Sequence, residues 1–334
     1  MAETTEKIRV SLGTAIILGF IRSKLDASPT TAYLMTYVPS RCRANCAFCP
    51  QSRESNADLD RLSRVVWPIY PTDDVIVGLS KAFQKKRIRR VCIQSLNFPE
   101  FYNTLVNLVK EIRKNVKIPI SLSCQPINAE QMDTLKELGV ERIGIPLDAA
   151  TEQIFNEVKG RDVGGPYSWN RTFELLNEAV RIFGKGRVST HIIIGLGESE
   201  KDVAQLTQRL VDSNILPGLF SFTPIKGTAL ENRVQPSITV YRRMQLVRYL
   251  LVTHKTRVEQ MRFSPEGTLL DYGVTREELN AIIDSGEPFR TSGCPHCNRP
   301  FYNESPRGPF YNYPYKLTNE HITAVKRELK RVGE

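Results

Sequence analysis

The chain has 334 residues, of which 41% are hydrophobic and 25% charged, and its formal net charge is +10. This composition is typical of a globular protein long enough for one large domain or two smaller ones. No apolar run approaches the roughly 18 residues that cross a bilayer, so we expect no membrane segment. The apolar stretch 14–20 is short, is followed by Arg22 and Lys24, and lacks a small-residue cleavage site. It therefore predicts a docking helix in a cytoplasmic protein rather than a signal peptide.

The positive charge suits three kinds of partner: nucleic acid, an anionic cofactor or an acidic protein. Its densest run is 85–90, with the sequence KKRIRR. This run joins an expected helix to an expected strand, where cations are favoured by the helix dipole, so a solvated helix end is the preferred interpretation. The sequence shows neither interleaved aromatic and basic residues nor zinc-finger spacing, so we do not expect a nucleic-acid partner.

Residues 1–32 are expected to form an N-terminal helical segment. From residue 33 onward, short β-branched runs alternate with amphipathic stretches, which is typical of βαβ units and a parallel sheet. The expected fold is an α/β (β/α) TIM-type barrel over residues 33–298, whole or nearly closed, with its chemistry at the C-terminal ends of the strands. The expected strands are 33–37, 89–94, 118–123, 142–146, 188–194, 218–222, 258–263 and, as an eighth, 289–291.

Helices are expected between these strands, with Asn128, Ser199 and Ser237 as N-caps, because their side-chain oxygens accept from free first-turn amides. The expected helices cover 72–85, 101–114, 129–138, 169–183, 201–213 and 237–254. Residues 299–334 change in character, since prolines alternate with aromatic side chains. This tail is predicted to pack on the barrel as a lid or wall and to end in a helix over 321–332.

Seven cysteines in a chain without a signal peptide favour metal or redox chemistry over disulfides. Cys42, Cys46 and Cys49 follow the first expected strand with C-x3-C-x2-C spacing. Three thiolates can hold a four-iron cluster and leave its fourth iron without a protein ligand, open to substrate. A structural zinc site would require four ligands, generally in C-x2-C pairs.

The run C-R-A-N-C-A-F-C, with Phe48 before the last cysteine, resembles the signature of the radical S-adenosylmethionine (SAM) superfamily. The residues after it, 49–53, are similar to those of biotin synthases. The resemblance implies that SAM binds the open iron of a [4Fe-4S] cluster through its amino and carboxylate groups. An electron from a donor such as ferredoxin then cleaves SAM to methionine and a 5′-deoxyadenosyl radical, which abstracts a hydrogen atom.

The stretch 191–198 resembles the superfamily's G-x-I-x-G-x-x-E motif, which lies against the adenine of SAM. It implies that Ile193 and Gly195 contact SAM, together with Phe48 and with Gln94 at the end of the second strand. His191 replaces the first glycine of the motif, and it is interpreted as a hydrogen-bonded core residue rather than a ligand.

Two further positions correspond to biotin synthase. Asp148 matches an acidic residue that reaches the ribose or substrate, although it could also cap a helix. Arg262 matches the arginine beside the second cluster of that enzyme, and the resemblance implies a catalytic role for it.

The remaining cysteines are Cys92, Cys124, Cys294 and Cys297. Barrel closure would bring them to one mouth, where they could hold an auxiliary [4Fe-4S] cluster. Ser189 stands where biotin synthase has a cysteine on its fifth strand, and this departure disfavours a [2Fe-2S] site. The alternative is that Cys92 and Cys124 are buried small hydrophobic residues and that the C-terminal pair forms half a zinc site.

The biotin-synthase-like pattern, the missing fifth-strand cysteine, the run G-C-P-x-C-N-R-P and the aromatic tail together resemble the archaeal-type lipoyl synthases, which work as a pair of related radical SAM proteins. The resemblance implies sulfur insertion into an octanoyl chain on a lysine of an acidic carrier protein or peptide, with a second radical SAM protein as partner. Biotin synthase, a maturase or carbon-skeleton mutase, and a basic, metal-stabilised nucleic-acid-binding module remain alternatives.

Overall fold

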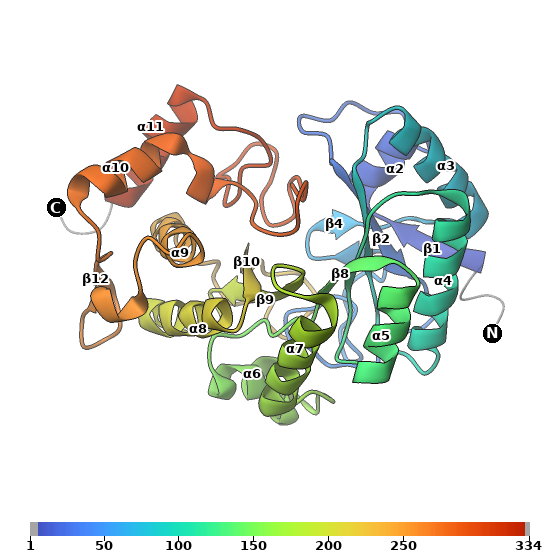
Figure 1. The fold of residues 1–334 in the computed structure, drawn as a ribbon, viewed down its shortest axis with the longest axis horizontal. Coiled ribbons are helices and arrows are strands. Elements are labelled where there is room, and N and C mark those ends of the chain that lie inside the picture. The colour runs from blue at the N-terminus through green and yellow to red at the C-terminus, as the bar shows by residue number, and fades with distance from the viewer. Residues whose placement is uncertain (1–5, 331–334) are drawn as a thin grey trace.

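The computed structural model describes residues 6–330, which form an α/β structure around one eight-stranded sheet with the order β10-β9-β8-β7-β6-β2-β1-β5. The six strands from β2 to β10 are parallel, and β1 and β5 continue the sheet in antiparallel pairing at one edge (Figure 1). Two short hairpins, β3–β4 and β11–β12, lie outside this sheet. The strands are β1 Lys7–Val10, β2 Thr31–Thr36, β3 Arg61–Leu62, β4 Val65–Val66, β5 Ile69–Pro71, β6 Arg90–Gln94, β7 Ile120–Ser123, β8 Val140–Gly144, β9 Val188–Ile194, β10 Ile215–Ser221, β11 Arg262–Phe263 and β12 Leu269–Asp271.

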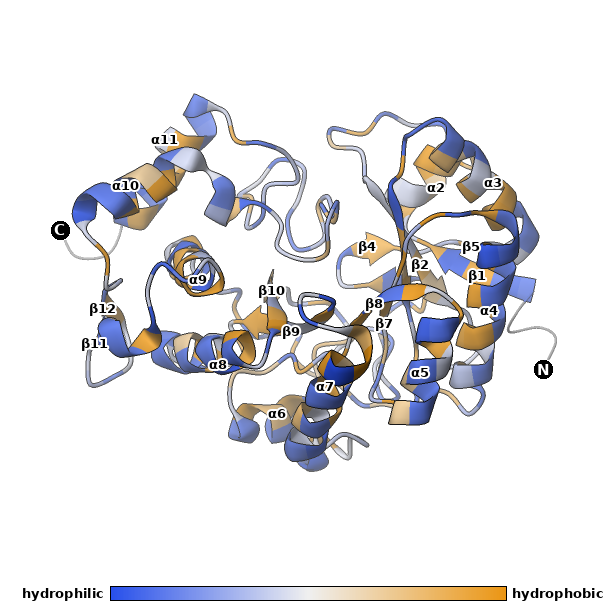
Figure 2. Cartoon of the chain, viewed as in Figure 1, coloured by the Kyte–Doolittle hydropathy of each residue, from blue (hydrophilic) through white to orange (hydrophobic). Residues whose placement is uncertain are grey.

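Each parallel crossover contains at least one helix, as parallel pairing requires a long connection. In α4, the buried residues Leu105, Leu108, Val109 and Ile112 follow the spacing that forms one apolar face on a helix. Figure 2 shows apolar and polar faces on these helices. None of the described helices is long and apolar enough to cross a membrane. The helices are α2 Leu12–Leu18, α3 Thr72–Gln84, α4 Phe101–Asn115, α5 Ala129–Glu137, α6 Glu152–Val158, α7 Trp169–Phe183, α8 Glu200–Asp212, α9 Ile238–Val252, α10 Arg276–Ser285 and α11 Asn319–Lys330, with 3-10 turns η1 Arg161–Val163, η2 Val258–Gln260 and η3 Glu287–Phe289.

The α/β class and the six strands between residues 31 and 221 agree with the sequence analysis. The side chains of Asn128, Ser199 and Ser237 cap α5, α8 and α9 as expected. The expected docking helix corresponds to α2, but β1 before it also pairs with β2 and joins the sheet. The C-terminal helix is α11, and the end of its expected range, 331–332, lies outside the described residues.

The expectation of a seventh and an eighth barrel strand is wrong. Residues 258–263 form the turn η2 and the short strand β11, which pairs with β12 because that segment returns directly beside it. The region expected as the eighth strand contains η3 and only an isolated bridge between Arg290 and Tyr313. The main sheet is therefore an open, barrel-like sheet whose edges are β10 and β5.

The tail segment 290–303 crosses the open side of the sheet. At β10 the hydroxyl of Ser292 accepts from the N–H of Leu219 at 2.9 Å. At β2 the hydroxyl of Thr31 donates to the carbonyl of His296 at 2.8 Å, and on β6 Arg90 donates to the carbonyl of Pro295 at 3.3 Å. This segment thus forms a wall across the interior, although residues 290–298 were expected to belong to the barrel, and it meets β2 and β6 at their first residues.

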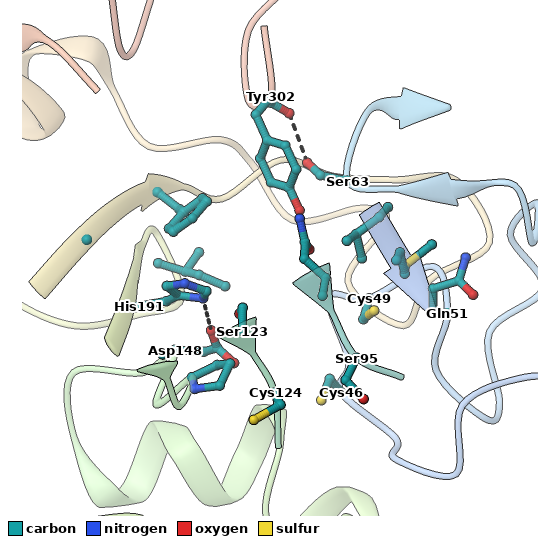
Figure 3. A pocket seen from close by; sticks show the side chains of 18 of the residues that line it. Cys46, Cys49, Gln51, Ser63, Ser95, Ser123, Cys124, Asp148, His191 and Tyr302 are labelled. Carbon is teal, nitrogen blue, oxygen red and sulfur yellow. Dashed lines mark hydrogen bonds and ion pairs between the residues drawn. The ribbon is translucent and has the colours of Figure 1, made fainter. Parts of the chain in front are cut away.

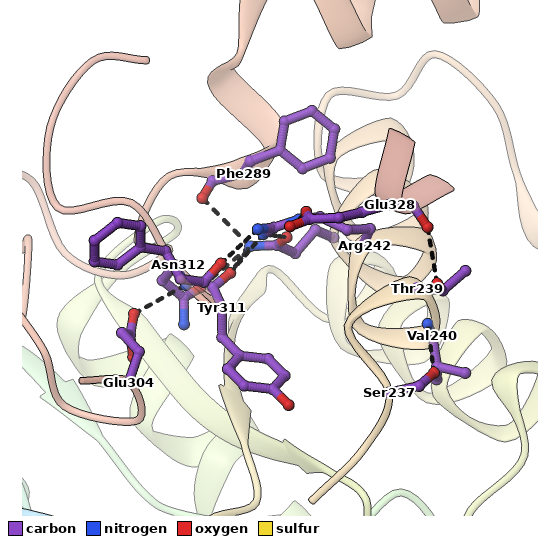
Figure 4. Close-up of polar contacts among 11 residues, drawn as sticks. Ser237, Thr239, Val240, Arg242, Phe289, Glu304, Tyr311, Asn312 and Glu328 are labelled. Carbon is purple, nitrogen blue, oxygen red and sulfur yellow. Dashed lines mark hydrogen bonds and ion pairs between the residues drawn. The ribbon is translucent and has the colours of Figure 1, made fainter. Parts of the chain in front are cut away.

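The fully buried Arg242 of α9 holds the returning part of the tail (Figure 4). Its guanidinium donates to the carbonyl of Tyr311 at 2.8 Å and pairs with Glu328 of α11 at 2.9 Å. It also donates to the carbonyl of Phe310. One buried cation therefore joins three segments that are distant in sequence. Carbonyl and carboxylate oxygens accept its N–H groups, which burial would otherwise leave without hydrogen-bond partners.

Glu304 is the buried acid of the same tail, and its carboxylate accepts the N–H groups of Asn312 and Asn303 at 2.9 and 2.8 Å. Burial is the main cause that raises its pKa from 4.5 to about 7, although these two N–H groups lower it. The folded protein therefore binds this proton more tightly than the unfolded chain does.

Because the folded-state pKa of Glu304 is raised, the stability that it contributes is present below about pH 4.5 and is lost as the pH rises to about 7. We expect the wild-type protein to lose on the order of 3 kcal/mol of unfolding free energy over this range relative to Glu304→Gln. Urea titrations of both proteins at several pH values measure this difference. Parallel pH profiles for the two proteins would contradict it.

Candidate active site

A pocket lies inside the open sheet and is lined by all six parallel strands, the loop after β2 and the tail. The lining residues alternate along the strands, because every second side chain of a strand points to the same face. Figure 3 shows part of this lining, with Tyr302 reaching in from the tail. The inward positions are Tyr33 and Met35, Cys92 and Gln94, Ser121 and Ser123, Gly144, Ser189, His191 and Ile193, and Gly218 and Phe220.

Cys42, Cys46 and Cys49 lie together on the loop that follows β2 and line one end of this pocket. The N–H of Asn97 donates to the Sγ of Cys42 at 3.2 Å. Burial raises the pKa of the Cys46 thiol to about 12, partly offset by the positive charge of Lys159, and burial also raises the pKa of Cys49. Buried thiols with a nearby N–H donor and a cation are suited to hold an anionic iron–sulfur group.

Four of the five residues expected to contact SAM line the same pocket: Phe48, Gln94, Asp148 and Ile193. Gly195 does not line it. Its φ of 107° belongs to a turn where a Cβ would lie 2.8 Å from Pro236. Its N–H donates to Glu198 at 2.6 Å, so this glycine shapes the turn after β9 and does not face the pocket.

Asp148 is buried with a φ of 70°, and its carboxylate forms an ion pair with Lys159 at 2.6 Å. Lys159 also lies 5.2 Å from the centre of the Tyr167 ring. The Nδ1 of His191 lies 3.9 Å from the other carboxylate oxygen. Burial is the main cause that lowers the pKa of His191 to about 4, which keeps the ring neutral near pH 7. Lys159 was not predicted from the sequence, because it comes directly after α6 and has no motif around it.

Cys92, Cys294 and Cys297 form a second group of thiols. The pKa of Cys92 is raised, first by burial and then by Cys294 and Cys297. The Tyr33 hydroxyl lies 3.5 Å from the Sγ of Cys297, and the Ser121 hydroxyl donates to the Sγ of Cys294 at 3.6 Å. This group lies nearer the N-terminal ends of the strands than the first group. Cys124 is not part of it, so the expectation that all four remaining thiols meet at one mouth is wrong.

Cys124 does not join that group, which corrects its expected role as a ligand. In the sheet, Cys92 pairs with Ser121, and Cys124 lies three residues farther along, just beyond the end of β7. Three residues of strand span about 10 Å. Burial alone raises the pKa of this thiol, to about 12, and no other thiol contributes. Cys124 therefore fits the alternative interpretation of a buried small side chain.

Arg262 lies outside the pocket, because β11 belongs to the separate hairpin. Its side chain is 74% exposed and pairs with Asp271 at 2.9 Å. Two other arginines, Arg299 and Arg90, lie beside the second thiol group, and the guanidinium of Arg299 stacks 3.9 Å from the centre of the Phe220 ring. The expected catalytic role of Arg262 is therefore wrong. Arg299 follows Cys297 by two residues, and only the path of the tail reveals its position.

Aromatic side chains form a wall of the pocket, and Tyr302 in this wall lies near a thiol of each group. Phe220 contacts His191 edge-to-face at 4.8 Å and Tyr302 at 5.6 Å. The hydroxyl of Ser63 donates to the backbone carbonyl of Tyr302, which fixes the tail against the β3–β4 hairpin (Figure 3). This contact was not apparent in the sequence, which indicated only that the tail is aromatic.

Within residues 6–330, no three His, Cys, Asp or Glu side chains gather closely enough to hold a single metal ion. Each cysteine of a cubane cluster binds a different iron, so its thiolates lie farther apart than around one ion. In both cysteine groups, the chemistry of the donor atoms fits an iron–sulfur cluster.

The ion pair between Lys159 and Asp148 provides a test of the site. Lys159→Met leaves a buried carboxylate unpaired, so we expect the free energy of unfolding to fall by about 3 kcal/mol. The matched control is Arg171→Met, because Arg171 pairs with Glu174 while both side chains are more than half exposed. The control should lose about 0.5 kcal/mol or less. Urea denaturation measures both values, and equal losses would contradict the assignment.

Comparisons with known proteins agree with this site. Residues 36–210 match the family model of the Radical SAM superfamily. The biotin synthase of Persephonella marina is 23% identical over 262 residues, covering 76% of this chain and 72% of the relative. The biotin synthase of Aquifex aeolicus is 26% identical over 252 residues, covering 73% and 71%.

Solved structures show the same fold. A methylornithine synthase superposes with a TM-score of 0.54 at 15% identity, over 73% of this chain and 77% of that one. A [FeFe]-hydrogenase maturase from Carboxydothermus hydrogenoformans superposes with a TM-score of 0.52 at 15% identity, over 90% and 82%. With the three-cysteine loop after β2, these findings lead to one conclusion: the chain belongs to the radical SAM superfamily, in its biotin-synthase-like group.

Proposed function

We propose that this protein is a sulfurtransferase that inserts sulfur at an unactivated C–H position, with an auxiliary iron–sulfur cluster as the sulfur donor. One observation carries the proposal: two separate groups of three cysteines face one pocket from different levels of the sheet. A substrate between them would meet a hydrogen-abstracting group on one side and a sulfide source on the other. Neither group shares a ligand with the other.

The first group, Cys42, Cys46 and Cys49, would hold the [4Fe-4S] cluster and leave one iron for SAM. When bound, the cluster and SAM together supply the radical that removes a hydrogen atom from the substrate. The surrounding residues would bind and orient the molecules in the pocket. Lys159 fixes the carboxylate of Asp148, which faces the pocket, and the ring of Tyr167 covers Lys159. The buried aromatic wall around Phe220 keeps water from the space between the two groups.

The second group would hold the auxiliary cluster through Cys92, Cys294 and Cys297, with Arg299 beside it. Its arrangement differs from a site whose cysteines come from neighbouring strands. The residue paired with Cys92 on β7 is Ser121, and the first inward residue on β9 is Ser189. Two thiols instead come from the tail, which supports a [4Fe-4S] cluster of altered ligation over a biotin-type [2Fe-2S] site.

The proposed substrate is an octanoyl chain on a lysine of an acidic carrier protein, and the activity is lipoyl synthesis together with a second radical SAM protein. An apolar acyl chain suits the aromatic wall of Phe220 and Tyr302, and a basic protein suits an acidic carrier. The proposed electron donor is a small redox protein such as a ferredoxin.

Iron analysis after anaerobic reconstitution tests the two sites. The wild-type protein should contain about eight iron atoms per chain, since each [4Fe-4S] cluster carries four. Replacing Cys92, Cys294 and Cys297 together by alanine should leave about four iron atoms and intact SAM cleavage. The matched control, Cys124→Ala, should retain about eight. Loss of iron in the Cys124 variant, or only four iron atoms in the wild type, would overturn this assignment.

The substrate is tested with an octanoyl-lysine peptide and the reconstituted enzyme, and mass spectrometry reads the product. We expect a mass gain of sulfur on the peptide in the wild type. The variant without Cys92, Cys294 and Cys297 should instead form 5′-deoxyadenosine but no sulfurated peptide. If dethiobiotin gains sulfur and the peptide does not, the enzyme is a biotin synthase and the lipoyl proposal is wrong.

A further inference from the structure

The N-terminal ends of the parallel strands share one edge of the sheet, so the connections that precede these strands form one face of the molecule. This face is strongly basic. Exposed cations occur before β6, β7 and β9, and none of them forms an ion pair with another residue in the range 6–330. We call this set the basic face: Lys85, Lys86, Arg87, Arg89, Lys114, Lys117, Lys185 and Arg187.

Acidic residues do not balance this charge. The connections before β8 and β10 contribute Glu137 and Asp212, and Asp212 is already paired with Arg257 at 3.1 Å. Glu141 is likewise paired with Arg90. A helix dipole explains cations after one helix, but it does not require unpaired cations in three separate connections. The summed potential of such a face attracts acidic macromolecules.

The loop that carries the auxiliary cysteines lies on this same face. The N–H of Arg89 donates to the carbonyl of Thr30, and the hydroxyl of Thr30 donates to the carbonyl of His296 at 2.6 Å. Gly293, Pro295 and His296 are exposed, and Cys294 and Cys297 are partly exposed. A macromolecule bound to the basic face would therefore cover the loop that holds two of the three auxiliary ligands.

We propose that the basic face is the docking surface of an acidic iron–sulfur carrier protein that rebuilds the auxiliary cluster. This inference rests on the proposed function, because sulfur insertion consumes cluster sulfide, and a reaction that supplies iron and sulfide must follow each turnover. In the transfer, iron–thiolate bonds of the carrier break as bonds to Cys92, Cys294 and Cys297 form. The three thiol protons pass to the carrier's released thiolates and to solvent, and no electron is gained or lost.

A protein is favoured over nucleic acid as the occupant. The basic connections, 85–89, 114–119 and 184–187, contain no aromatic residue on which a base could stack. The face also lies beside exposed cysteine-bearing backbone, which gives a cluster carrier a target and gives a nucleic acid none. Charge complementarity would act mainly on the rate of encounter.

The test isolates the auxiliary site with a full-length variant in which Cys42, Cys46 and Cys49 are replaced by alanine. The probe is a purified acidic carrier protein loaded with one [4Fe-4S] cluster, and visible circular dichroism follows transfer. We expect Lys85→Glu, Arg87→Glu and Arg89→Glu together to slow transfer at least 10-fold at low salt. The difference should largely disappear at about 0.5 M salt, where screening is strong.

The matched control carries the same charge change elsewhere: Lys201→Glu, Arg276→Glu and Lys316→Glu, three exposed side chains outside the basic face. This control should accept the carrier's cluster at the same rate as the protein without charge reversals. Both variants should accept a cluster equally from inorganic iron and sulfide, which shows that the reversals leave the site intact. If neither the parent variant nor its two charge-reversed forms take up a cluster from inorganic iron and sulfide, the proposed function fails.

If chemical loading succeeds but both variants accept the carrier's cluster at the same rate, the docking inference fails and the proposed function stands. A gel-shift titration with single-stranded RNA gives the other overturning result. If the charge reversals abolish RNA binding but leave cluster transfer unchanged, the basic face binds nucleic acid instead.

Discussion

The structure depends on one constraint: six parallel strands do not close into a barrel, so their inward side chains must be covered by something else. The tail provides this cover. It crosses from β10 to β2 and is hydrogen-bonded at both sides of the opening, through the Ser292 hydroxyl at β10 and the His296 carbonyl at β2. Polar inward residues such as Ser121 and Ser189 thereby come to line an interior pocket rather than a solvent-filled groove. Closure by an irregular chain segment, rather than by two more strands, lets the tail carry functional groups into the interior.

The tail's position depends in turn on buried charge. Arg242 is fully buried, and Glu328 and backbone carbonyls satisfy it, so neither α9 nor α11 can move without leaving a buried cation unpaired. This makes the arrangement of Cys294, Cys297 and Arg299 a consequence of packing more than 25 residues away in sequence. The second thiol group is thus a tertiary feature, whereas the first depends mainly on one short loop.

The two groups also sit in different electrostatic surroundings. The first lies near Lys159 and Asp148, whose charges largely cancel at short range. The second lies near Arg299 and Arg90, and the latter is paired with Glu141. Positive charge near a cluster ligated by thiolates favours its more reduced, more anionic forms. The different surroundings are consistent with different roles for the two sites in the proposed reaction.

The sequence by itself determined the first group and most of the elements. The spacing of Cys42, Cys46 and Cys49 is local, and the periodicity of apolar residues and the N-caps act within one helix or strand, so these features needed no tertiary information. Only the tertiary structure decided the rest. It excluded Cys124 and Arg262, and it brought in Lys159, Arg299 and Tyr302. The physical reason is that register along the strands and the path of an irregular tail depend on long-range packing, which no short sequence pattern encodes.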